Sequence, residues 1–328
     1  MSLRANDYEL LDLGTTGHAE SLADAAARGL TATPKFLPCH LFYDERGSEL
    51  FEAITRTPEY YPTRADEQIL RAHAGEIVRA TGAPLELVEL GSGSSTKTAP
   101  IVDAILDVQD ALDYRPIDVS RAALEWGSES LLEGRSKLRV RAVCGDYADG
   151  LAQLGPTQKR RLVLWLGSSI GNQTRDEAAE FLSRAQLSLA PGDALLIGID
   201  LRKDAAVLEA AYDDAAGITA AFNKNLLHRL RDELGARLDP DAFVHRAVYD
   251  EGCGAVRIYL ESLRDQVVHI EALKLDVSFA AGERIHTEDS TKYSVAEIEA
   301  LASVAGLVLE HTWFDRKRRF SESLLRRV

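Results

Sequence analysis

The stretch VELGSGSSTK, residues 88–97, has the composition of a turn that holds a ligand by its backbone. Gly91 and Gly93 allow the chain to approach a bound group closely, and a following helix would present free N–H donors to that group. A dinucleotide site would have a third glycine where this chain has Thr96, so the match to that fingerprint is weak. The turn therefore predicts a cofactor site of another kind.

Two acids further along the chain extend this site. Asp118 ends the segment YRPIDVS, and Asp146 ends the segment LRVRAVCGD and is followed by Tyr147. At the ends of parallel strands, such carboxylates can accept both hydroxyls of a ribose and the amino group of an adenine, which an aromatic ring can cover. With Glu89 before the glycines, the set resembles the acid-x-Gly-x-Gly site of S-adenosylmethionine-dependent methyltransferases. The alternative is that each acid only caps the next helix or turn.

The segment LGSSIGNQT, residues 166–174, is a candidate for contact with a substrate amine. Many amine N-methyltransferases have an Asn or Asp at the end of this strand, and Asn172 is the corresponding residue here. Its side chain can accept a hydrogen bond from the amine and so direct the nitrogen lone pair. An Asx turn before a helix at Arg175 is the alternative.

The segment HTEDSTKY, residues 286–293, contains a second candidate, the pair Glu288 and Ser290. A spacing of two directs both side chains the same way in an extended segment. A carboxylate accepts an imidazole N–H, and a hydroxyl can bond to the other ring nitrogen. Neither residue is needed to start the next helix, because Ser294 and Glu297 form its capping box. A solvated loop is the alternative.

Short apolar segments alternate with helical ones between residues 85 and 200, which predicts a parallel sheet covered on both faces. The predicted fold class is α/β: a Rossmann-like class I methyltransferase sheet with an inserted α+β substrate-binding domain. Residues 1–62 are expected to be irregularly helical, 203–235 helical, and a hairpin follows. The predicted cofactor-binding domain spans 65–202 and 293–328, and the substrate-binding domain spans 12–64 and 203–292.

The chain as a whole resembles the L-histidine Nα-methyltransferases of the ergothioneine pathway. This resemblance rests on YYPTR (60–64), VELGSGSSTK, CGDY (144–147), LGSSIGN and YDDAAGITAAFNKN (212–225). That family trimethylates the α-amino group of histidine with S-adenosylmethionine, which gives hercynine, the first step of the pathway.

The resemblance implies roles for individual residues. It implies cofactor contacts for Gly91, Lys97, Asp118, Asp146 and Tyr147. It implies a substrate cleft with Tyr43, Phe51, Tyr60, Gly167, Asn172 and Tyr212, in which Glu288 and Ser290 face the imidazole. We assign orientation of the amine to Asn172, Tyr43 and Tyr212. Packing in a rigid turn is the alternative for Tyr60, and burial on a helix face is the alternative for Tyr212. Ile258 departs from the family, where a Met is expected near the side-chain pocket.

The composition of the chain limits the classes of partner that it could bind. A net charge of −14 argues against nucleic acid and anionic membranes, because phosphate binding needs a concentrated basic surface. Three cysteines without metal-ligand spacing favour reduced thiols and no metal site, as in a cytoplasmic protein. We expect a monomer whose partner is L-histidine. The competing hypotheses are a methyltransferase for another amino acid or small amine, a silent binding protein of the same fold, and a nicotinamide oxidoreductase, the least favoured.

Overall fold

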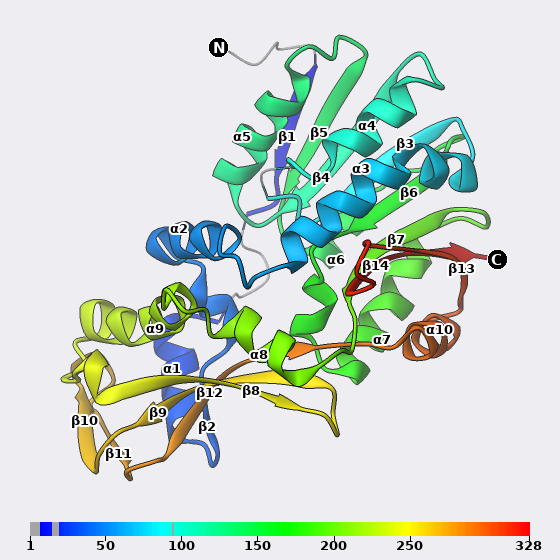
Figure 1. The fold of residues 1–328 in the computed structure, drawn as a ribbon. Helices are drawn as coiled ribbons and strands as arrows, with labels where there is room; N and C mark the ends of the chain where they lie inside the picture. Colours follow the sequence, from blue (N-terminus) through cyan, green and yellow to red (C-terminus); the bar gives the residue numbers. More distant parts are fainter. Residues whose placement is uncertain (1–6, 15–19, 94) are drawn as a thin grey trace. The chain divides into compact units, whose positions relative to one another are not determined.

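The computed structural model describes residues 7–14, 20–93 and 95–328, which form two compact units (Figure 1). The first unit comprises residues 7–14, Pro62–Leu201 and Tyr293–Val328. The second unit comprises residues 20–61 and Arg202–Lys292. The chain thus leaves the first unit after Leu201 and returns to it at Tyr293, so the second unit contains an insertion. The first unit also includes residues 7–14 and 62–64, which differs from the expected boundaries at 12 and 65.

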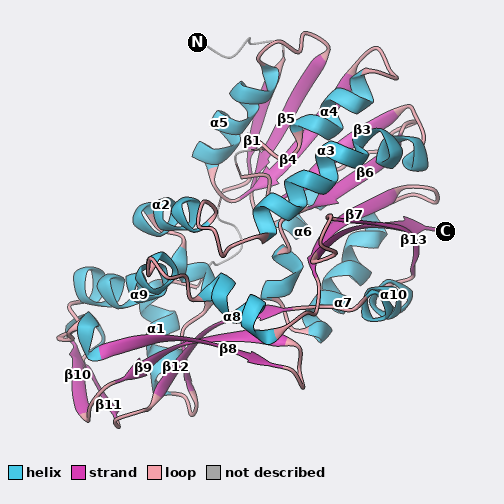
Figure 2. Ribbon diagram, viewed as in Figure 1, coloured by secondary structure: helices cyan, strands magenta, loops and turns pink. Residues whose placement is uncertain are grey.

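The first unit is built on an eight-stranded sheet with the order β1-β5-β4-β3-β6-β7-β14-β13 (Figure 2). Its strands are β1 (Tyr8–Asp12), β3 (Leu85–Leu90), β4 (Leu112–Asp118), β5 (Leu138–Cys144), β6 (Arg160–Trp165), β7 (Ala194–Asp200), β13 (Leu307–Phe314) and β14 (Phe320–Arg327). Strands β1 and β3 to β7 are parallel, whereas β14 pairs antiparallel with both β7 and β13. Every residue of β3 and β7 is buried, as expected for strands covered on both faces.

Helices cover both faces of this sheet. The cluster on one face includes residues of α3 (Pro62–Thr81), α4 (Ala99–Leu106) and α5 (Arg121–Leu132). The cluster on the other face includes residues of α6 (Tyr147–Ala152), α7 (Arg175–Ala185) and α10 (Val295–Val304). Short 3-10 turns follow β6 and α7, namely η2 (Ser169–Asn172) and η3 (Gln186–Ser188). Helix α10 begins with the predicted capping box of Ser294 and Glu297.

The strand order places the ligand-binding edge of the sheet. The chain runs outward from β3 through β4 to β5 and then returns to β6 on the other side of β3. Ligands of open α/β sheets bind at the carboxyl ends of strands beside such a reversal. Gly91 directly follows β3, and the segment that includes Gly167 and Asn172 follows β6. The predicted residues therefore lie at the edge where this topology binds ligands.

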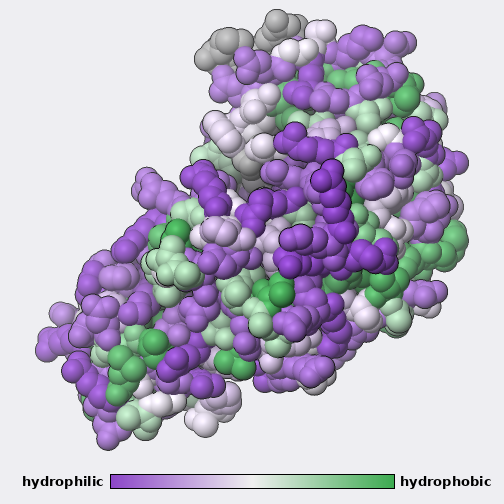
Figure 3. Space-filling model, in the orientation of Figure 1, coloured by the Kyte–Doolittle hydropathy of each residue, from purple (hydrophilic) through white to green (hydrophobic). Residues whose placement is uncertain are grey.

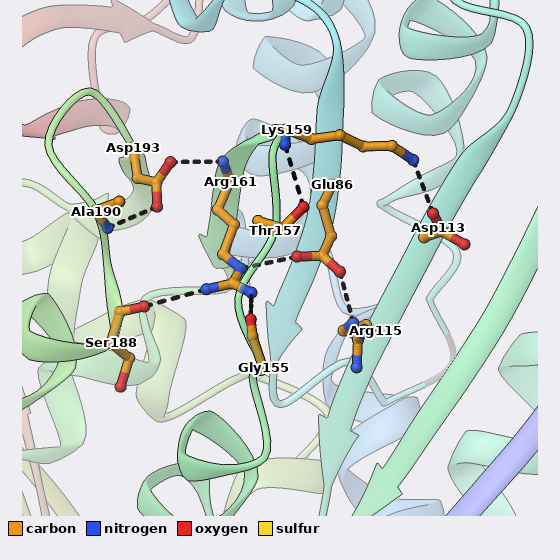
Figure 4. A network of polar contacts seen from close by, with 10 residues as sticks. All are labelled: Glu86, Asp113, Arg115, Gly155, Thr157, Lys159, Arg161, Ser188, Ala190 and Asp193. Carbon is orange, nitrogen blue, oxygen red and sulfur yellow. Dashed lines mark hydrogen bonds and ion pairs between the residues drawn. The ribbon is translucent and has the colours of Figure 1, made fainter.

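A charged network joins the opposite, amino-terminal parts of the strands (Figure 4). Glu86 of β3 accepts hydrogen bonds from Arg115 at 2.7 Å and from Arg161 at 2.8 Å. Asp193 accepts the backbone N–H of Arg161 at 2.8 Å. Glu86 and Arg161 are buried, and a buried charge is tolerated only where partners replace its water. This network holds β3, β4 and β6 together and leaves the carboxyl ends of the strands for ligands.

The second unit contains a four-stranded sheet and a small hairpin. The sheet has the order β2-β12-β9-β8, formed by β2 (Lys35–Phe36), β12 (Arg284–Thr291), β9 (Ala255–Ser262) and β8 (Phe243–Asp250). The hairpin pairs β10 (Gln266–Ile270) with β11 (Leu275–Phe279). The helices are α1 (Leu22–Thr31), α2 (Glu45–Ile54), α8 (Ala205–Tyr212) and α9 (Ile218–Leu234), and the 3-10 turns are η1 (Cys39–Phe42), η4 (Pro240–Ala242) and η5 (Glu271–Leu273). Its core joins α1 and α9 to the strands.

Two expectations about local structure need correction. The predicted irregular helix over residues 1–62 misses strand β1, which pairs parallel with β5 at the edge of the sheet. This edge strand is largely exposed and so lacks the apolar run of its neighbours. The single helix over 203–235 is two helices, because the carboxylate of Asp214 accepts the N–H groups of Ile218 and Thr219 where α9 begins. Residues 286–291 belong to β12, between β9 and β2, so the segment is extended as expected for the pair Glu288 and Ser290, and the alternative of a loop is wrong.

Most of the face drawn in Figure 3 is hydrophilic, with hydrophobic residues in small separate patches. Within residues 7–14, 20–93 and 95–328, no helix is long and apolar enough to cross a membrane. The same residues contain no group of three or more His, Cys, Asp or Glu side chains that could hold a metal ion.

Candidate active site

The turn after β3 requires glycine at position 91. Gly91 has a φ of +67°, and a Cβ there would lie 2.5 Å from the hydroxyl of Tyr147. Gly93 has a φ of +48°, and a Cβ at that position would meet no heavy atom within 4 Å. The backbone at Gly93 is thus open, as a cofactor-binding turn requires.

Asp118 links the end of β4 to this turn. Its Oδ2 accepts the N–H of Gly93 at 2.9 Å, and its Oδ1 accepts the N–H of Ser120 at 2.8 Å. An ionised carboxylate has about four acceptor positions, so these two bonds leave capacity for two further donors. The half-buried side chain can therefore hold the glycine turn and still accept the two hydroxyls of a ribose.

Asp146 and Tyr147 lie where β5 ends and α6 begins. Asp146 is exposed and caps α6 by accepting the N–H of Asp149 at 2.8 Å through Oδ1. Asp146 thus caps α6 through one oxygen, and this cap is compatible with ligand contact through the other. The ring of Tyr147 packs edge-on against Trp165 and Phe181, with centroids 6.2 and 6.0 Å away. Burial raises the pKa of Tyr147 to about 12, so it stays neutral.

Glu89 is buried and serves the frame of the site rather than its surface. Its two carboxylate oxygens accept the hydroxyl of Thr98 at 2.8 and 2.7 Å, and Oε2 also accepts the hydroxyl of Tyr114. Burial raises the pKa of Glu89 to about 7, and the hydrogen bonds from Tyr114 and Thr98 oppose this rise. Glu89, the acid of the acid-x-Gly-x-Gly pattern, therefore links β3 to the start of α4 and to β4 through these hydrogen bonds.

Lys97 and Gly167 share a partner that the sequence did not indicate, Asp66 of α3. The Nζ of Lys97 lies 2.8 Å from Oδ2 of Asp66, and the same oxygen accepts the N–H of Gly167 at 3.0 Å. Asp66 is fully buried, so this ion pair fixes Lys97 against the end of β6. Glu322 of β14 is also fully buried. Burial is the main cause, and the neighbouring Asp66 carboxylate is the second cause, of a pKa of Glu322 that lies well above its usual range. The protonated form of Glu322 is therefore favoured in the folded protein.

A Glu322→Gln variant should be more stable than the wild type at neutral and alkaline pH. In the unfolded chain Glu322 ionises near its ordinary pKa of 4.5, whereas in the folded protein its pKa lies well above that value. In the wild type, the contribution of Glu322 to the free energy of unfolding is fully present below that unfolded-state pKa. It is lost as the pH rises toward the folded-state pKa. The amide keeps a neutral group in place without this loss.

Urea unfolding at about pH 5 and about pH 8 measures the difference in the free energy of unfolding between variant and wild type. We expect the advantage of Glu322→Gln to grow between these values. An advantage that shrinks over this interval would mean that Glu322 is ionised in the folded state.

Asn172 lies at the end of η2 and is exposed. The turn is shaped by Ser168, which has a φ of +61° and accepts the N–H of Asp200 at 3.0 Å through its hydroxyl. Helix α7 is capped by Thr174, which forms a capping box with Glu177. The start of α7 therefore does not depend on the amide of Asn172, which stays a candidate for the substrate amine.

Four predicted aromatic residues form a continuous series within the second unit. The ring centroids of Tyr43 and Phe51 are 5.8 Å apart, those of Phe51 and Tyr60 are 6.4 Å apart, and those of Tyr60 and Tyr212 are 6.0 Å apart. The four residues lie directly after η1, in α2, in the turn before α3 and in α8, and are thereby brought together. Phe222 of α9, which the sequence did not suggest, adds a contact to both Tyr43 and Phe51 at 5.9 and 6.1 Å.

The series ends at a polar group on β12. The hydroxyls of Tyr212 and Ser290 lie 2.7 Å apart, and the Nζ of Lys292 donates to each of them at 2.8 Å. Glu288 and Ser290 alternate along β12 and so share one face of it, and Lys292 is the residue directly after the strand. A register shift between His286 and Glu288 marks a bulge that sets this face.

The carboxylate of Glu288 is poised to change its charge near neutral pH. The side chain is half-buried, and loss of water raises its pKa to about 7 although the Lys292 ammonium acts in the opposite direction. Ile258 pairs directly with Glu288 across β9 and β12 and is buried. Ile258 therefore lies beside Glu288, as the expected pocket position requires.

Tyr212 is also held through its backbone by a histidine. His245 Nε2 lies 2.8 Å from the carbonyl oxygen of Tyr212, and its Nδ1 lies 2.9 Å from the amide nitrogen of Asn223. The carbonyl needs a donor and the amide nitrogen needs an acceptor, so the ring is the neutral tautomer with its proton on Nε2. Burial lowers the pKa of His245, which agrees with this state. No sequence signal distinguished this histidine from the others.

The fold and the cofactor side of the site define the class of the protein. A parallel sheet with a final antiparallel pair of strands, a glycine turn after β3, and acids after β4 and β5 are the features of class I S-adenosylmethionine-dependent methyltransferases.

Comparison with known proteins identifies the family. Residues 22–327 match the family of histidine-specific, S-adenosylmethionine-dependent methyltransferases, and the chain belongs to it. The chain is 45% identical to histidine N-alpha-methyltransferase of Mycolicibacterium smegmatis, over 95% of this chain and 97% of that protein. For the Mycobacterium tuberculosis protein of the same name, identity is 43% over 90% and 92% of the two chains. Ergothioneine biosynthesis protein 1 of Neurospora crassa is 35% identical over 85% of this chain and 32% of its own length.

These matches confirm the predicted fold class, the family resemblance and the use of S-adenosylmethionine as methyl donor. The roles of individual site residues stay predictions.

Proposed function

We propose that this protein transfers methyl groups from S-adenosylmethionine to the α-amino group of L-histidine until the trimethylated betaine, hercynine, is formed. The observation that carries the proposal is the shared face of β12, where Glu288 lies on the same side of the strand as Ser290, whose hydroxyl contacts Tyr212 of the aromatic series. A carboxylate and a hydroxyl two residues apart match the two nitrogens of an imidazole. Membership of a histidine-specific family supports this choice of side chain. The cytoplasmic location and the monomeric state stay predictions.

The cofactor side has the donors and acceptors that S-adenosylmethionine requires. Asp118 has two acceptor positions left for ribose hydroxyls, Asp146 has one oxygen outside its cap for the adenine amino group, and Tyr147 provides a ring beside it. Gly91 and Lys97 complete the set that would hold the cofactor. When bound, the cofactor supplies a methyl group on a positively charged sulfur.

Methyl transfer is an in-line displacement in which the amine lone pair forms the N–C bond while the C–S bond breaks. The amine must therefore be neutral, and an α-amino group with a pKa of about 8 loses its proton without a strong base. The first two products lose a proton before the next attack, and the third is a fixed cation that ends the series. Correct orientation can lower such a barrier by about 7–11 kcal/mol. We assign this orientation to Asn172, Tyr43 and Tyr212.

A methyltransferase for another amino acid is the second candidate, because Ile258 stands beside Glu288 where a Met is expected. One assay separates the two. The purified protein is incubated with S-adenosylmethionine and each free amino acid in turn, and products are resolved by mass. We expect histidine alone to gain three methyl groups efficiently. Efficient methylation of a different amino acid, with histidine unchanged, would contradict the proposal.

Asn172→Ala should lower the rate of methylation by about 10- to 100-fold, because a misaligned lone pair reduces the fraction of productive encounters. Affinity for S-adenosylmethionine, measured by isothermal titration, should change less than about two-fold, because the proposed partner of Asn172 is the substrate amine. Asp176→Ala, a change at an exposed residue of the same segment, serves as the control and should keep the wild-type rate. Wild-type turnover by Asn172→Ala would leave Asn172 as a loop residue only.

A further inference from the structure

His245 of β8 is a buried titratable residue that no proposed step of the reaction uses. The residue is 5% exposed, its Nε2 lies 2.8 Å from the carbonyl oxygen of Tyr212, and its Nδ1 lies 2.9 Å from the amide nitrogen of Asn223. Tyr212 is the last residue of α8, where backbone carbonyls have no partner within the helix. His245 therefore supplies a donor at the helix end that carries the last residue of the aromatic series.

The direction of these hydrogen bonds is fixed by a third carbonyl. The amide nitrogen of Asn223 also donates to the carbonyl oxygen of Tyr259 at 3.0 Å. A carbonyl only accepts, so the nitrogen of the Asn223 amide, and not its oxygen, faces both partners. His245 Nδ1 must then accept, and Nε2 carries the proton that the Tyr212 carbonyl accepts. The bonds run from β9 through α9 and β8 to the end of α8.

The position of the Tyr212 backbone determines where its hydroxyl lies. That hydroxyl is 2.7 Å from the hydroxyl of Ser290, and the ring centroid is 6.0 Å from that of Tyr60. The hydroxyl is at the far end of the side chain, so a small rotation of the Tyr212 peptide displaces it more than any other atom of the residue. A displacement of about 1 Å can slow a reaction about 100-fold where orientation provides the rate.

We propose that His245 is a positioning residue for methyl transfer: its Nε2–H holds the backbone of Tyr212, so that the Tyr212 hydroxyl orients the substrate amine. This inference rests on the proposed function, in which Tyr212 contacts that amine. His245 itself does not touch the substrate. Its effect on the rate must therefore pass through the hydroxyl of Tyr212.

Two amide variants separate the two nitrogens of the ring. The side-chain nitrogen of Gln reaches about as far from the backbone as Nε2 of histidine, whereas the amide of Asn reaches only as far as Nδ1. Burial lowers the pKa of His245, although the Tyr212 carbonyl and the Asp213 and Asp214 carboxylates act in the opposite direction, so the ring is neutral at about pH 8. Neutral amides are therefore the matched replacements at that pH.

The experiment measures the rate of histidine methylation at about pH 8. His245→Gln keeps a donor for the Tyr212 carbonyl and should stay within about three-fold of the wild-type rate. His245→Asn lacks that donor and should be slower by about 10-fold or more. Affinity for S-adenosylmethionine should change less than about two-fold in both variants. Should His245→Asn not fold, His245→Leu, which also lacks the donor, takes its place.

A double-mutant cycle distinguishes positioning of Tyr212 from a general structural role. The same substitutions are made in Tyr212→Phe, which keeps the ring and lacks the hydroxyl. If His245 acts through that hydroxyl, His245→Gln and His245→Asn should differ by less than about two-fold in this background. A general structural role would slow His245→Asn by the same factor with or without the hydroxyl.

His269→Asn is the matched control. His269 of β10 also has a partner at its Nδ1, Asp276 at 2.7 Å, but it lies on the small hairpin, and this variant should keep the wild-type rate. A folded His245→Asn protein with the wild-type rate would overturn the inference, as would equal losses in both backgrounds or equal rates of His245→Gln and His245→Asn. A wild type that methylates a different amino acid instead of histidine would contradict the proposed function, whereas the same ratios measured with that amino acid would still test His245.

Discussion

Asp118→Ala should bind S-adenosylmethionine about 100-fold or more weakly than the wild type. The variant loses a charged acceptor for two proposed ribose hydroxyls, and each such bond contributes about 1.5–3 kcal/mol. It also loses the bonds to the N–H groups of Gly93 and Ser120, which hold the glycine turn against the end of β4. The measurement is isothermal titration with the methyl donor alone.

Asp193→Ala is a suitable control for Asp118→Ala. Asp193 is likewise a carboxylate at a strand end that accepts two backbone N–H groups, those of Arg161 and Ala190, at 2.8 Å each. It lies at the amino end of β7, away from the edge where ligands bind. This variant should lose stability and keep its affinity for the methyl donor. Equal affinities in folded Asp118→Ala and wild type would exclude the proposed ribose contact.

Glu288→Ala should bind histidine about 10- to 100-fold more weakly, while its affinity for S-adenosylmethionine is retained. The imidazole N–H would lose a charged acceptor in a partly buried site. The position of residue 288, beside Ile258, would become apolar. Bulkier apolar amino acids should therefore become relatively better substrates. The measurements are histidine affinity by titration and the ratio of methylation rates for histidine and tryptophan.

The pH dependence of histidine binding provides a second test of Glu288. Because its raised pKa is about 7, the carboxylate should gain its charge, and histidine affinity should increase, as the pH rises from about 6 to about 8. Ionisation of the histidine ligand itself affects all variants equally. The pH profile of histidine affinity is therefore compared between the wild type and Glu288→Gln, in which the change caused by ionisation of Glu288 should be absent. Identical pH profiles for the two proteins would show that Glu288 does not contact the ligand.

Asp289→Ala is the control for position. Asp289 is the next residue of β12, so its side chain points to the opposite face, where it lies 2.9 Å from Nε2 of His286. This variant should methylate histidine like the wild type. Loss of histidine affinity in both variants would indicate damage to β12 rather than a specific contact.

Much of the fold could be predicted because its signals are local. The buried strands β3 and β7 are nearly continuous apolar runs, and the capping box at Ser294 marks the start of α10 in four residues. The return of the chain to the first unit near residue 293 was visible in the sequence, because a series of strand-like segments is followed there by a helix and two further strands. Strand β1 was missed because a short, exposed edge strand shows little hydrophobic pattern of its own.

The residues of the candidate site likewise include some that local sequence signals predict and others that they do not. Gly91, Asp118 and Asp146 could be proposed from the sequence, because each lies at the end of a recognisable strand or within two residues of it. Asp66 and Glu322 could not, because their partners come from segments far away in the chain. Both residues look like ordinary solvated acids in the sequence.

The sequence by itself determined the order of the strands from β3 to β7, the glycine turn, the acids at strand ends and, through its long motifs, the family. Only the tertiary structure decided which side chains meet: the aromatic series from Tyr43 to Tyr212, and the triangle of Lys292, Tyr212 and Ser290. The physical reason is that strand and helix patterns arise from interactions between neighbours in the chain. A buried ammonium, by contrast, acquires its role from the atoms that replace its water, and these come from residues up to 80 positions away.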